Sequence, residues 1–391
     1  MLSKKGLRVL SQRAKHILES SCPAKCMSTA PEEEKYKVRG RNVLDVMKER
    51  PLVGDGGMVI ALEKRGYVTA GNWTPEAVLE YPEAVRQLHR EFLRAGSDVL
   101  QSFTFYAAEG KLKSSSTGKN YTVAEINQAG CDLVKEVAAE GDALTCGGLS
   151  PTPSYGQGKG KQAVQDEFRK QVEIYMEHDL DFMLAEFFAT IEETEWAIEV
   201  MKASGKPCGA TMRIGPTSDK SDVDSGECAV RMAAAGADLV GVNCSFGPVT
   251  SLKTIEKMKT SLDAAGLEPF LVMQPVAFHT GDCEHNKDGY HEVPEFPLAL
   301  ESRSITRWDA RKYARAAYDL GVRYIGGCCG FEPYHIREIA EELAPERGSR
   351  PPGADKNEQF GEAIKYSLLE YMRNRVGKDY WYGINAKRPS P

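Results

Sequence analysis

Three cysteines stand where two apolar, strand-like segments of the sequence end. Cys244 follows the apolar segment 238–243, and Cys328 and Cys329 lie within a Gly-Gly-Cys-Cys-Gly segment at 326–330. Adjacent residues of a regular strand point to opposite faces, so neighbouring thiols reach one point only where the backbone turns, and glycines permit such a turn. Three thiolates that leave one coordination position open are typical of a catalytic zinc site. The alternatives are buried cysteines that pack as small apolar groups, or a vicinal disulfide.

Two carboxylates also follow strand-like segments. Asp55 lies in the glycine-rich turn 54–57, where it can accept hydrogen bonds from a substrate ammonium or from neighbouring backbone amides. Glu186 ends an apolar segment, where an unpaired carboxylate is costly, and this favours a role in contact with a ligand.

Aromatic residues follow the first two strand-like segments of the chain. Trp73 lies in the first strand-to-helix connection, and Phe105 and Tyr106 end the second strand. Aromatic faces attract quaternary ammonium groups, so the three residues are candidates for the wall of a cation pocket. The alternative for Trp73 is packing at a helix start.

Apolar segments of strand length alternate with amphipathic segments of helix length from residue 40 onward. The expected strands are Pro51–Met58, Asp98–Phe105, Ala143–Leu149, Asp181–Phe188, Pro207–Ile214, Asp238–Cys244, Pro269–Val276 and Tyr324–Cys329. The expected helices are Pro75–Ala95, Val123–Ala139, Asp166–His178, Thr194–Ala203, Gly226–Ala235, Leu252–Ala265, Arg307–Leu320 and Pro333–Leu343. Eight such units predict an α/β fold, a (β/α)8 TIM barrel, with an open doubly wound sheet as the alternative. In such a barrel the candidate residues meet at the carboxyl ends of the strands.

Two connections are long. They cover Ser150–Gln165 and Ala277–Ile305, and connections of this length in a compact domain are usually lids or binding loops. The second one holds His279, Cys283 and His285, a weak candidate for another metal site, for which a solvated loop is the favoured interpretation.

Composition limits the class of protein. The chain has 391 residues, 41% hydrophobic and 27% charged, and its net charge of −6 provides no basic field for nucleic acid or an anionic membrane. No segment is long and apolar enough to span a bilayer. Ten cysteines are too sparse for a disulfide scaffold.

The first 35 residues differ from the rest. Residues 1–18 are basic and contain no acid, and their apolar residues fall on one helical face, as in a mitochondrial transit peptide. We expect residues 1–35 to be a flexible extension and the protein to be cytoplasmic, or mitochondrial if residues 1–30 act as a transit peptide.

From about residue 43 to residue 380 the sequence resembles the betaine–homocysteine S-methyltransferase family. The residues that carry the resemblance are 54–57, 61–67, 86–92, 241–244 and 326–335, and the cysteine and Gly-Gly-Cys-Cys-Gly elements are shared with the wider superfamily of zinc-dependent homocysteine methyltransferases. The resemblance implies a zinc enzyme that moves a methyl group from glycine betaine to L-homocysteine, giving dimethylglycine and L-methionine.

The resemblance also implies a role for each candidate residue. Zinc would be held by Cys244, Cys328 and Cys329, the homocysteine amino group by Asp55 and Glu186, and the trimethylammonium by Trp73, Phe105 and Tyr106, with Gly56, Gly57 and Ser102 near the other polar atoms of homocysteine. Phe187 and Ser102 depart from the family, which has Tyr and Thr at these positions. Residues 40–348 would form the barrel and residues 349–391 a dimerisation arm, so a homodimer or homotetramer is expected.

Three other functions fit the same residues. S-methylmethionine could replace betaine as the methyl donor. Cys328 and Cys329 could form a redox switch without zinc. The barrel could also be a catalytically silent binding scaffold.

Overall fold

The computed structural model describes residues 37–113, 119–356 and 364–383. It separates two units, residues 1–37 and 38–391. The predicted N-terminal extension, residues 1–35, lies outside the described residues. None of the described helices combines the length and the apolar character needed to cross a membrane.

Eight parallel strands form one sheet, in the order β1-β8-β7-β6-β5-β4-β3-β2. They are β1 Leu52–Val53, β2 Val99–Gln101, β3 Leu144–Leu149, β4 Phe182–Phe188, β5 Cys208–Met212, β6 Leu239–Asn243, β7 Phe270–Gln274 and β8 Val322–Ile325. The amide of Asp98, just before β2, donates to the carbonyl of Val53 in β1 at 2.7 Å, which joins the two end strands. The predicted (β/α)8 barrel is confirmed, and the open sheet is not what the chain forms.

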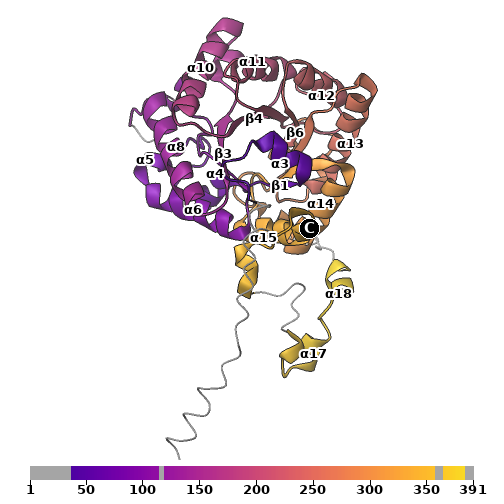
Figure 1. Cartoon of the computed structure of the whole chain (residues 1–391). Helices are drawn as coiled ribbons and strands as arrows, with labels where there is room; N and C mark the ends of the chain where they lie inside the picture. Colours follow the sequence, from indigo (N-terminus) through magenta and orange to yellow (C-terminus); the bar gives the residue numbers. More distant parts are fainter. Residues whose placement is uncertain (1–36, 114–118, 357–363, 384–391) are drawn as a thin grey trace, which may run out of the picture. The chain divides into compact units, whose positions relative to one another are not determined.

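Helices surround the strands (Figure 1). The longer ones are α6 Pro82–Ala95, α8 Val123–Ala139, α10 Lys161–Glu177, α11 Ile191–Lys202, α12 Ser225–Ala234, α13 Pro248–Ala265, α14 Arg307–Leu320 and α15 Pro333–Glu342. The short ones are α3 Val43–Glu49, α4 Met58–Lys64, α5 Ala77–Glu80, α7 Glu109–Leu112, α9 Pro153–Gly156, α16 Ala344–Arg347, α17 Glu370–Arg373 and α18 Lys378–Tyr382. The helix expected over Pro75–Ala95 is broken at Tyr81 because Pro82 disfavours a helical residue before it, and Tyr81 takes φ −139° and ψ 54°.

The strands that carry the candidate residues are shorter than the sequence predicted. We expected strands over Pro51–Met58 and Tyr324–Cys329, but they end at Val53 and Ile325. The following residues form two turns in close contact. The amide of Gly57 donates to the carbonyl of Phe331 at 3.0 Å, and a Cβ on Gly57 would lie 2.5 Å from the carbonyl oxygen of Cys328. Glycine is therefore required there so that the two turns can touch.

An unpredicted helix, α3, packs against the amino-terminal end of the barrel. In Figure 1 it lies across the strands, and its residues Val43, Val46 and Met47 are buried in one cluster with strand residues such as Leu144 and Leu239. This end of the barrel is thereby filled with side chains, whereas the carboxyl end holds the candidate site.

A buried ion cluster stabilises the amino-terminal end of the barrel. Asp98 accepts hydrogen bonds from Arg50, which follows α3, at 3.1 and 3.2 Å, and from Arg347 of α16 at 2.8 and 3.1 Å. Burial raises the pKa of Asp98, but the charges of Arg347 and Arg50 outweigh it and the pKa is lowered overall. One carboxylate thus joins the segments before β1, before β2 and after α15.

Replacing Arg50 with methionine is expected to lower the free energy of unfolding by about 2 kcal/mol. This is less than the 3–5 kcal/mol typical of a broken buried pair, because Asp98 keeps Arg347 as a partner. A lowered carboxylate pKa stabilises the fold above the pKa of the unfolded state, so the difference between the two proteins should shrink as pH falls through the folded pKa. Urea unfolding measured at several pH values checks this. Lys48→Met, which removes an exposed ion pair with Asp45, is the control and should change nothing measurable.

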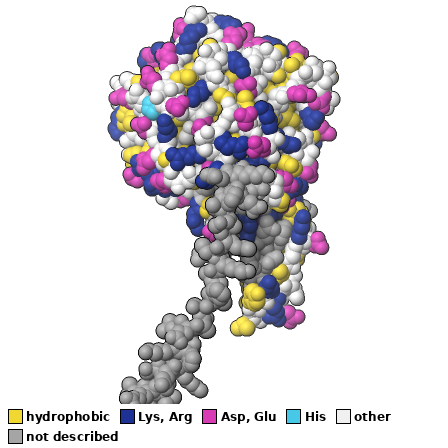
Figure 2. Space-filling model, in the orientation of Figure 1, with side chains coloured by type: hydrophobic (Ala, Val, Ile, Leu, Met, Phe, Trp, Pro, Cys, Tyr) yellow, Lys and Arg dark blue, Asp and Glu magenta, His cyan; other side chains and the backbone are white. Residues whose placement is uncertain are grey.

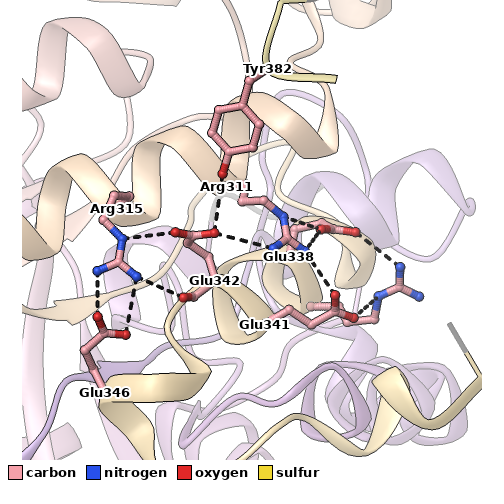
Figure 3. Close-up of polar contacts among 8 residues, drawn as sticks. Arg311, Arg315, Glu338, Glu341, Glu342, Glu346 and Tyr382 are labelled. Atoms are coloured by element: carbon pink, nitrogen blue, oxygen red, sulfur yellow. Dashed lines mark hydrogen bonds and ion pairs between the residues drawn. The ribbon is translucent and has the colours of Figure 1, made fainter. Parts of the chain in front are cut away.

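A second ion network joins α14 to α15 (Figure 3). Arg311 is buried and bonds Glu338, Glu341 and Glu342, and Arg315 bonds Glu342 and Glu346. The hydroxyl of Tyr382 in α18 donates to Glu342 at 3.4 Å. Next to it, Trp381 stacks on Trp308 of α14 with ring centroids 5.1 Å apart. The end of the described chain is thus attached to the helical layer.

The face shown in Figure 2 has basic and acidic side chains interspersed over the barrel helices. Among the described residues, this face presents no broad area of a single charge, in keeping with the small net charge.

Candidate active site

A cavity of about 380 Å³ opens at the carboxyl ends of the strands. Its lining includes every predicted site residue, namely Asp55, Gly56, Gly57, Trp73, Ser102, Phe105, Tyr106, Glu186, Cys244, Cys328 and Cys329. Four residues of the lining, Trp73, Tyr106, Phe187 and Cys244, are non-glycine residues with positive φ. Such backbone is costly for these residue types and is concentrated where the strands turn toward a functional pocket.

The three thiols of Cys244, Cys328 and Cys329, here called the thiol trio, meet at one point. Their sulfur atoms all lie within 4.8 Å of one another, with Cys244 and Cys329 3.8 Å apart and Cys328 and Cys329 4.0 Å apart. Sulfurs bound to one tetrahedral zinc at 2.3 Å are about 3.8 Å from each other. The trio therefore has the spacing and the donor chemistry of a zinc site with room for a further ligand.

One thiol of the trio is poised to ionise. Hydrogen bonds from Cys244 and Cys328, and then from the hydroxyl of Tyr290, hold the pKa of Cys329 well below its ordinary value. Burial raises the pKa of Cys244. The lowered pKa favours the thiolate at Cys329, and the thiolate is the form of cysteine that binds a metal cation.

Asp55 and Glu186, here called the acidic pair, lie in the same cavity. Burial raises the pKa of Asp55 to about 7, and burial followed by the charge of Asp55 raises the pKa of Glu186 to about 8. Asp55 accepts from the amide of Gln101 at 2.9 Å, and Glu186 accepts from the side chains of Gln101 and Asn243. Two buried carboxylates that have no cationic partner among the described residues are suited to bind an ammonium group.

Gly56 and Gly57 act through the backbone, because their turn, which also holds Asp55, packs against the turn of Cys328 and Cys329. Ser102 lines the cavity, but its hydroxyl lies 3.0 Å from that of Thr104 and accepts from the amide of Gly148 at 3.4 Å.

Phe105, Tyr106 and Phe187, here called the aromatic wall, contact one another. Phe105 and Tyr106 have ring centroids 4.0 Å apart, and Phe187 meets them edge-on at 5.5 and 6.3 Å. Trp73 packs instead near Phe296 at 6.1 Å, and its buried indole Nε1 has no hydrogen-bond partner among the described residues. Lys111 covers one face of Tyr106, with its Nζ 3.8 Å from the ring centroid.

The structure adds pocket residues that the sequence analysis missed. Gln101 and Asn243 orient Glu186, Tyr290 reaches Cys329 from the long connection 277–305, and Arg213 follows β5. Gln101 and Asn243 directly precede predicted site residues at strand ends, which was a usable signal. Tyr290 lies in a connection whose path no local pattern reveals.

The long connection packs beside the thiol trio. Its residues Phe278, Tyr290 and Val293 are buried in one cluster with Cys244, and the amide of Tyr290 donates to the carbonyl of Ser245 at 2.8 Å. The second metal candidate does not form: within the described parts of the chain the thiol trio is the one cluster found that could hold a metal ion, and the side chain of His285 is 84% exposed.

Comparison with protein families and with known proteins gives a consistent result. Residues 52–343 match the family model described as homocysteine S-methyltransferase. The chain is 54% identical over 342 residues to betaine–homocysteine S-methyltransferase 1 of Mus musculus, covering 87% of this chain and 84% of that one. It is 52% identical over 345 residues to an S-methylmethionine–homocysteine S-methyltransferase of Pongo abelii, covering 88% and 93%.

Among solved structures, the metallated homocysteine methyltransferase MmuM of Escherichia coli superposes with a TM-score of 0.58 at 19% identity. The match covers 76% of this chain and 98% of that one. At this identity the likeness concerns the fold, and it agrees with the barrel described above.

Proposed function

Because this chain belongs to the homocysteine S-methyltransferase family, we propose that it transfers a methyl group from glycine betaine to L-homocysteine, giving dimethylglycine and L-methionine. The observation that carries the proposal is the meeting of the thiol trio, the acidic pair and the aromatic wall in one cavity. A metal-binding thiol site, an ammonium site and a cation site are what this reaction requires.

We propose zinc as the metal of the thiol trio. When bound there, zinc lowers the pKa of a coordinated thiol and so supplies a thiolate near neutral pH. Cys244, Cys328 and Cys329 would hold it, and the contact between the turns at 54–57 and 326–330 fixes the positions of Cys328 and Cys329.

The protein's own groups would position the reactants. The acidic pair would take the homocysteine ammonium, which favours the ionised form of both carboxylates. The ammonium would thereby fix the amino acid with its sulfur directed toward the thiol trio. The aromatic wall would hold the trimethylammonium in line with that sulfur, and such alignment lowers the barrier to transfer. The cation–π attraction weakens as the donor loses its charge, so the wall contributes to binding more than to rate.

The experiment that tests the proposal combines metal analysis with product analysis. We expect about one zinc per chain and methionine formation from betaine and homocysteine. A second candidate donor, S-methylmethionine, is favoured by the 52% identity to the relative named for it. Turnover measured with each donor at equal concentrations distinguishes the two, and methionine formation from S-methylmethionine alone would reject betaine. Protein that lacks zinc, and whose thiol titre changes on oxidation, would instead support the redox switch.

We also propose that the protein is a homodimer or homotetramer, with residues 349–391 as the contact arm. In the described part of this segment, Tyr366 is 77% exposed and Leu368 96% exposed, which is unusual for large apolar side chains.

Light scattering at micromolar protein is therefore expected to give a multiple of 43.1 kDa. Replacing Tyr366, Leu368 and Tyr371 with serine should shift the mass toward that of one chain, because the apolar contact is lost. Val249→Ser, at an exposed position on α13, is the control and should leave the mass unchanged. A single-chain mass for the unaltered protein would reject the arm.

For localisation we propose the cytoplasm, with the mitochondrial matrix as the alternative if residues 1–30 act as a transit peptide. Imaging of fluorescent fusions with and without residues 1–30 distinguishes the two compartments.

A further inference from the structure

One cationic side chain lines the cavity in the described part of the chain, and the proposed chemistry above gives it no role. Arg213 follows β5, and its amide donates to the carbonyl of Phe188 in β4 at 2.9 Å, which fixes its backbone at the rim. Its side chain is only 16% exposed. A guanidinium that is mostly buried at a ligand cavity is suited to bind a planar anion such as a carboxylate.

The charge of Arg213 is only partly neutralised. Its Nη1 donates to one oxygen of Asp288 at 2.9 Å, and Lys220 bonds the other oxygen of the same carboxylate. Nearby, Lys287 and Asp222 pair with each other. One carboxylate thus serves two cations, and the Arg213–Asp288–Lys220 cluster keeps a net positive charge that one further anion would balance.

The position of Arg213 relative to the aromatic wall fits a methyl donor that carries both a quaternary ammonium group and a carboxylate. Its guanidinium carbon lies 5.1 Å from the ring centroid of Phe187, whose ring meets Phe105 and Tyr106 edge-on. Phe187 also packs in the cluster that contains the thiol trio. In betaine a single methylene separates the quaternary nitrogen from the carboxylate. A donor with its nitrogen against the aromatic wall therefore has its carboxylate within reach of the guanidinium.

The other ionisable groups of the cavity show that the surroundings of Arg213 differ from those of the acidic pair. Burial raises the pKa of Tyr106 to about 12, and the charge of Arg213 acts against that rise, so the guanidinium lies near the phenol. The pKa values of Asp55 and Glu186 are set by burial, by Gln101 and by neighbouring negative charge. Burial lowers the pKa of His291, which disfavours the charged form of the ring. Among the described residues that line the cavity, Arg213 is therefore the side chain with a full positive charge; Lys111 lies over the ring of Tyr106 but does not line the cavity.

We propose that Arg213, held in place by Asp288, binds the carboxylate of the methyl donor and makes the site selective for onium compounds that carry a carboxylate. This inference rests on the proposed function. Choline has the same trimethylammonium group but a neutral hydroxyl in place of the carboxylate, and it should gain nothing from Arg213.

Calorimetric titration of the zinc-loaded enzyme tests this without turnover. L-Homoserine, whose hydroxyl replaces the reacting thiol, fills the amino-acid site, and betaine or choline is added. In Arg213→Gln the affinity for betaine should fall about 10- to 100-fold, the usual loss for a hydrogen bond to a charged group, while the affinity for choline changes less than about 3-fold. Arg213→Lys, which keeps the charge without the fork geometry, should lie between the two.

The matched control is Arg231→Gln. Arg231 is also paired with an acid, Glu195, at 2.6 and 2.8 Å, but it belongs to the helical layer on α12 and does not line the cavity. The Arg231→Gln variant should bind betaine and choline as the unaltered protein does. Unchanged betaine affinity in Arg213→Gln, or equal losses for betaine and choline, would overturn the inference, since an equal loss is what a merely structural role produces.

The two proposals fail separately. If betaine binding depends on Arg213 but no methionine forms from betaine and homocysteine, the proposed function is wrong and the inference stands. If methionine forms but betaine binding does not depend on Arg213, the proposed function stands and the inference is wrong. An unaltered protein that does not bind betaine rejects this inference as well.

Discussion

Replacing Cys329 with alanine is expected to empty the metal site and to slow methyl transfer by more than about 100-fold. Losses of 10- to 100-fold already follow the removal of groups that only support metal ligands, and Cys329 is proposed as a ligand itself. It is also the thiol of the trio whose pKa is lowered, so its loss removes the sulfur that most favours the metal-binding thiolate form. Zinc content per chain and the rate of methionine formation should fall together.

A buried cysteine outside the cavity provides the control for this experiment. Cys131 lies in α8, and burial raises the pKa of its thiol to about 12, so it packs as a small apolar group. Cys131→Ala should keep one zinc and near-normal activity. Retention of full zinc and activity by Cys329→Ala would contradict the assignment of the thiol trio.

Replacing Glu186 with glutamine is expected to weaken the use of homocysteine by about 30- to 5,000-fold in kcat/KM, which corresponds to about 2–5 kcal/mol for one partner of a buried charge pair. The substrate ammonium would keep Asp55 but lose the second carboxylate. The amide of glutamine preserves the shape of the side chain and its hydrogen bond with Gln101, so the fold should be maintained. The effect should appear in the KM for homocysteine and leave the affinity for the methyl donor nearly unchanged.

The pH dependence gives an independent check on the acidic pair. The raised pKa values, about 7 for Asp55 and about 8 for Glu186, mean that both carboxyls become protonated, and lose their charge, as pH falls through this range. The kcat/KM for homocysteine, which reports the free enzyme, should therefore decline from pH 8 toward pH 6. In Glu186→Gln the upper step of that decline should disappear.

Glu193→Gln is the matched control for Glu186. Glu193 is also a buried carboxylate, its pKa is raised to about 7 by burial, and it accepts from the amide of Thr152 at 2.8 Å outside the cavity lining. It should leave the KM for homocysteine and its pH profile unchanged. Equal behaviour of the two variants would show that a buried carboxylate in general, and not the acidic pair, sets the profile.

The sequence by itself predicted the barrel and most of its helices. The helices over Val123–Ala139 and Arg307–Leu320 have the predicted bounds, because apolar spacing and the capping residues Thr122 and Thr306 act between neighbours along the chain. The thiol trio was predictable for a related reason: parallel strands of one barrel bring their ends to one rim, and each cysteine follows a strand-like segment.

Strand ends and helix interruptions were less predictable. The turns after Val53 and Ile325 and the break at Tyr81 depend on close backbone approach and on one proline, which apolar periodicity does not register.

Only the tertiary structure decided which residues complete the cavity. Tyr290 lies beside Cys329, and Arg213 bonds Asp288 across 75 residues of sequence. These contacts arise from strand register and from the path of the connection 277–305 over the rim. Short-range periodicity specifies which face a residue occupies on its own element, but two side chains from separate elements meet according to how those elements pack, and that information is spread over the whole core.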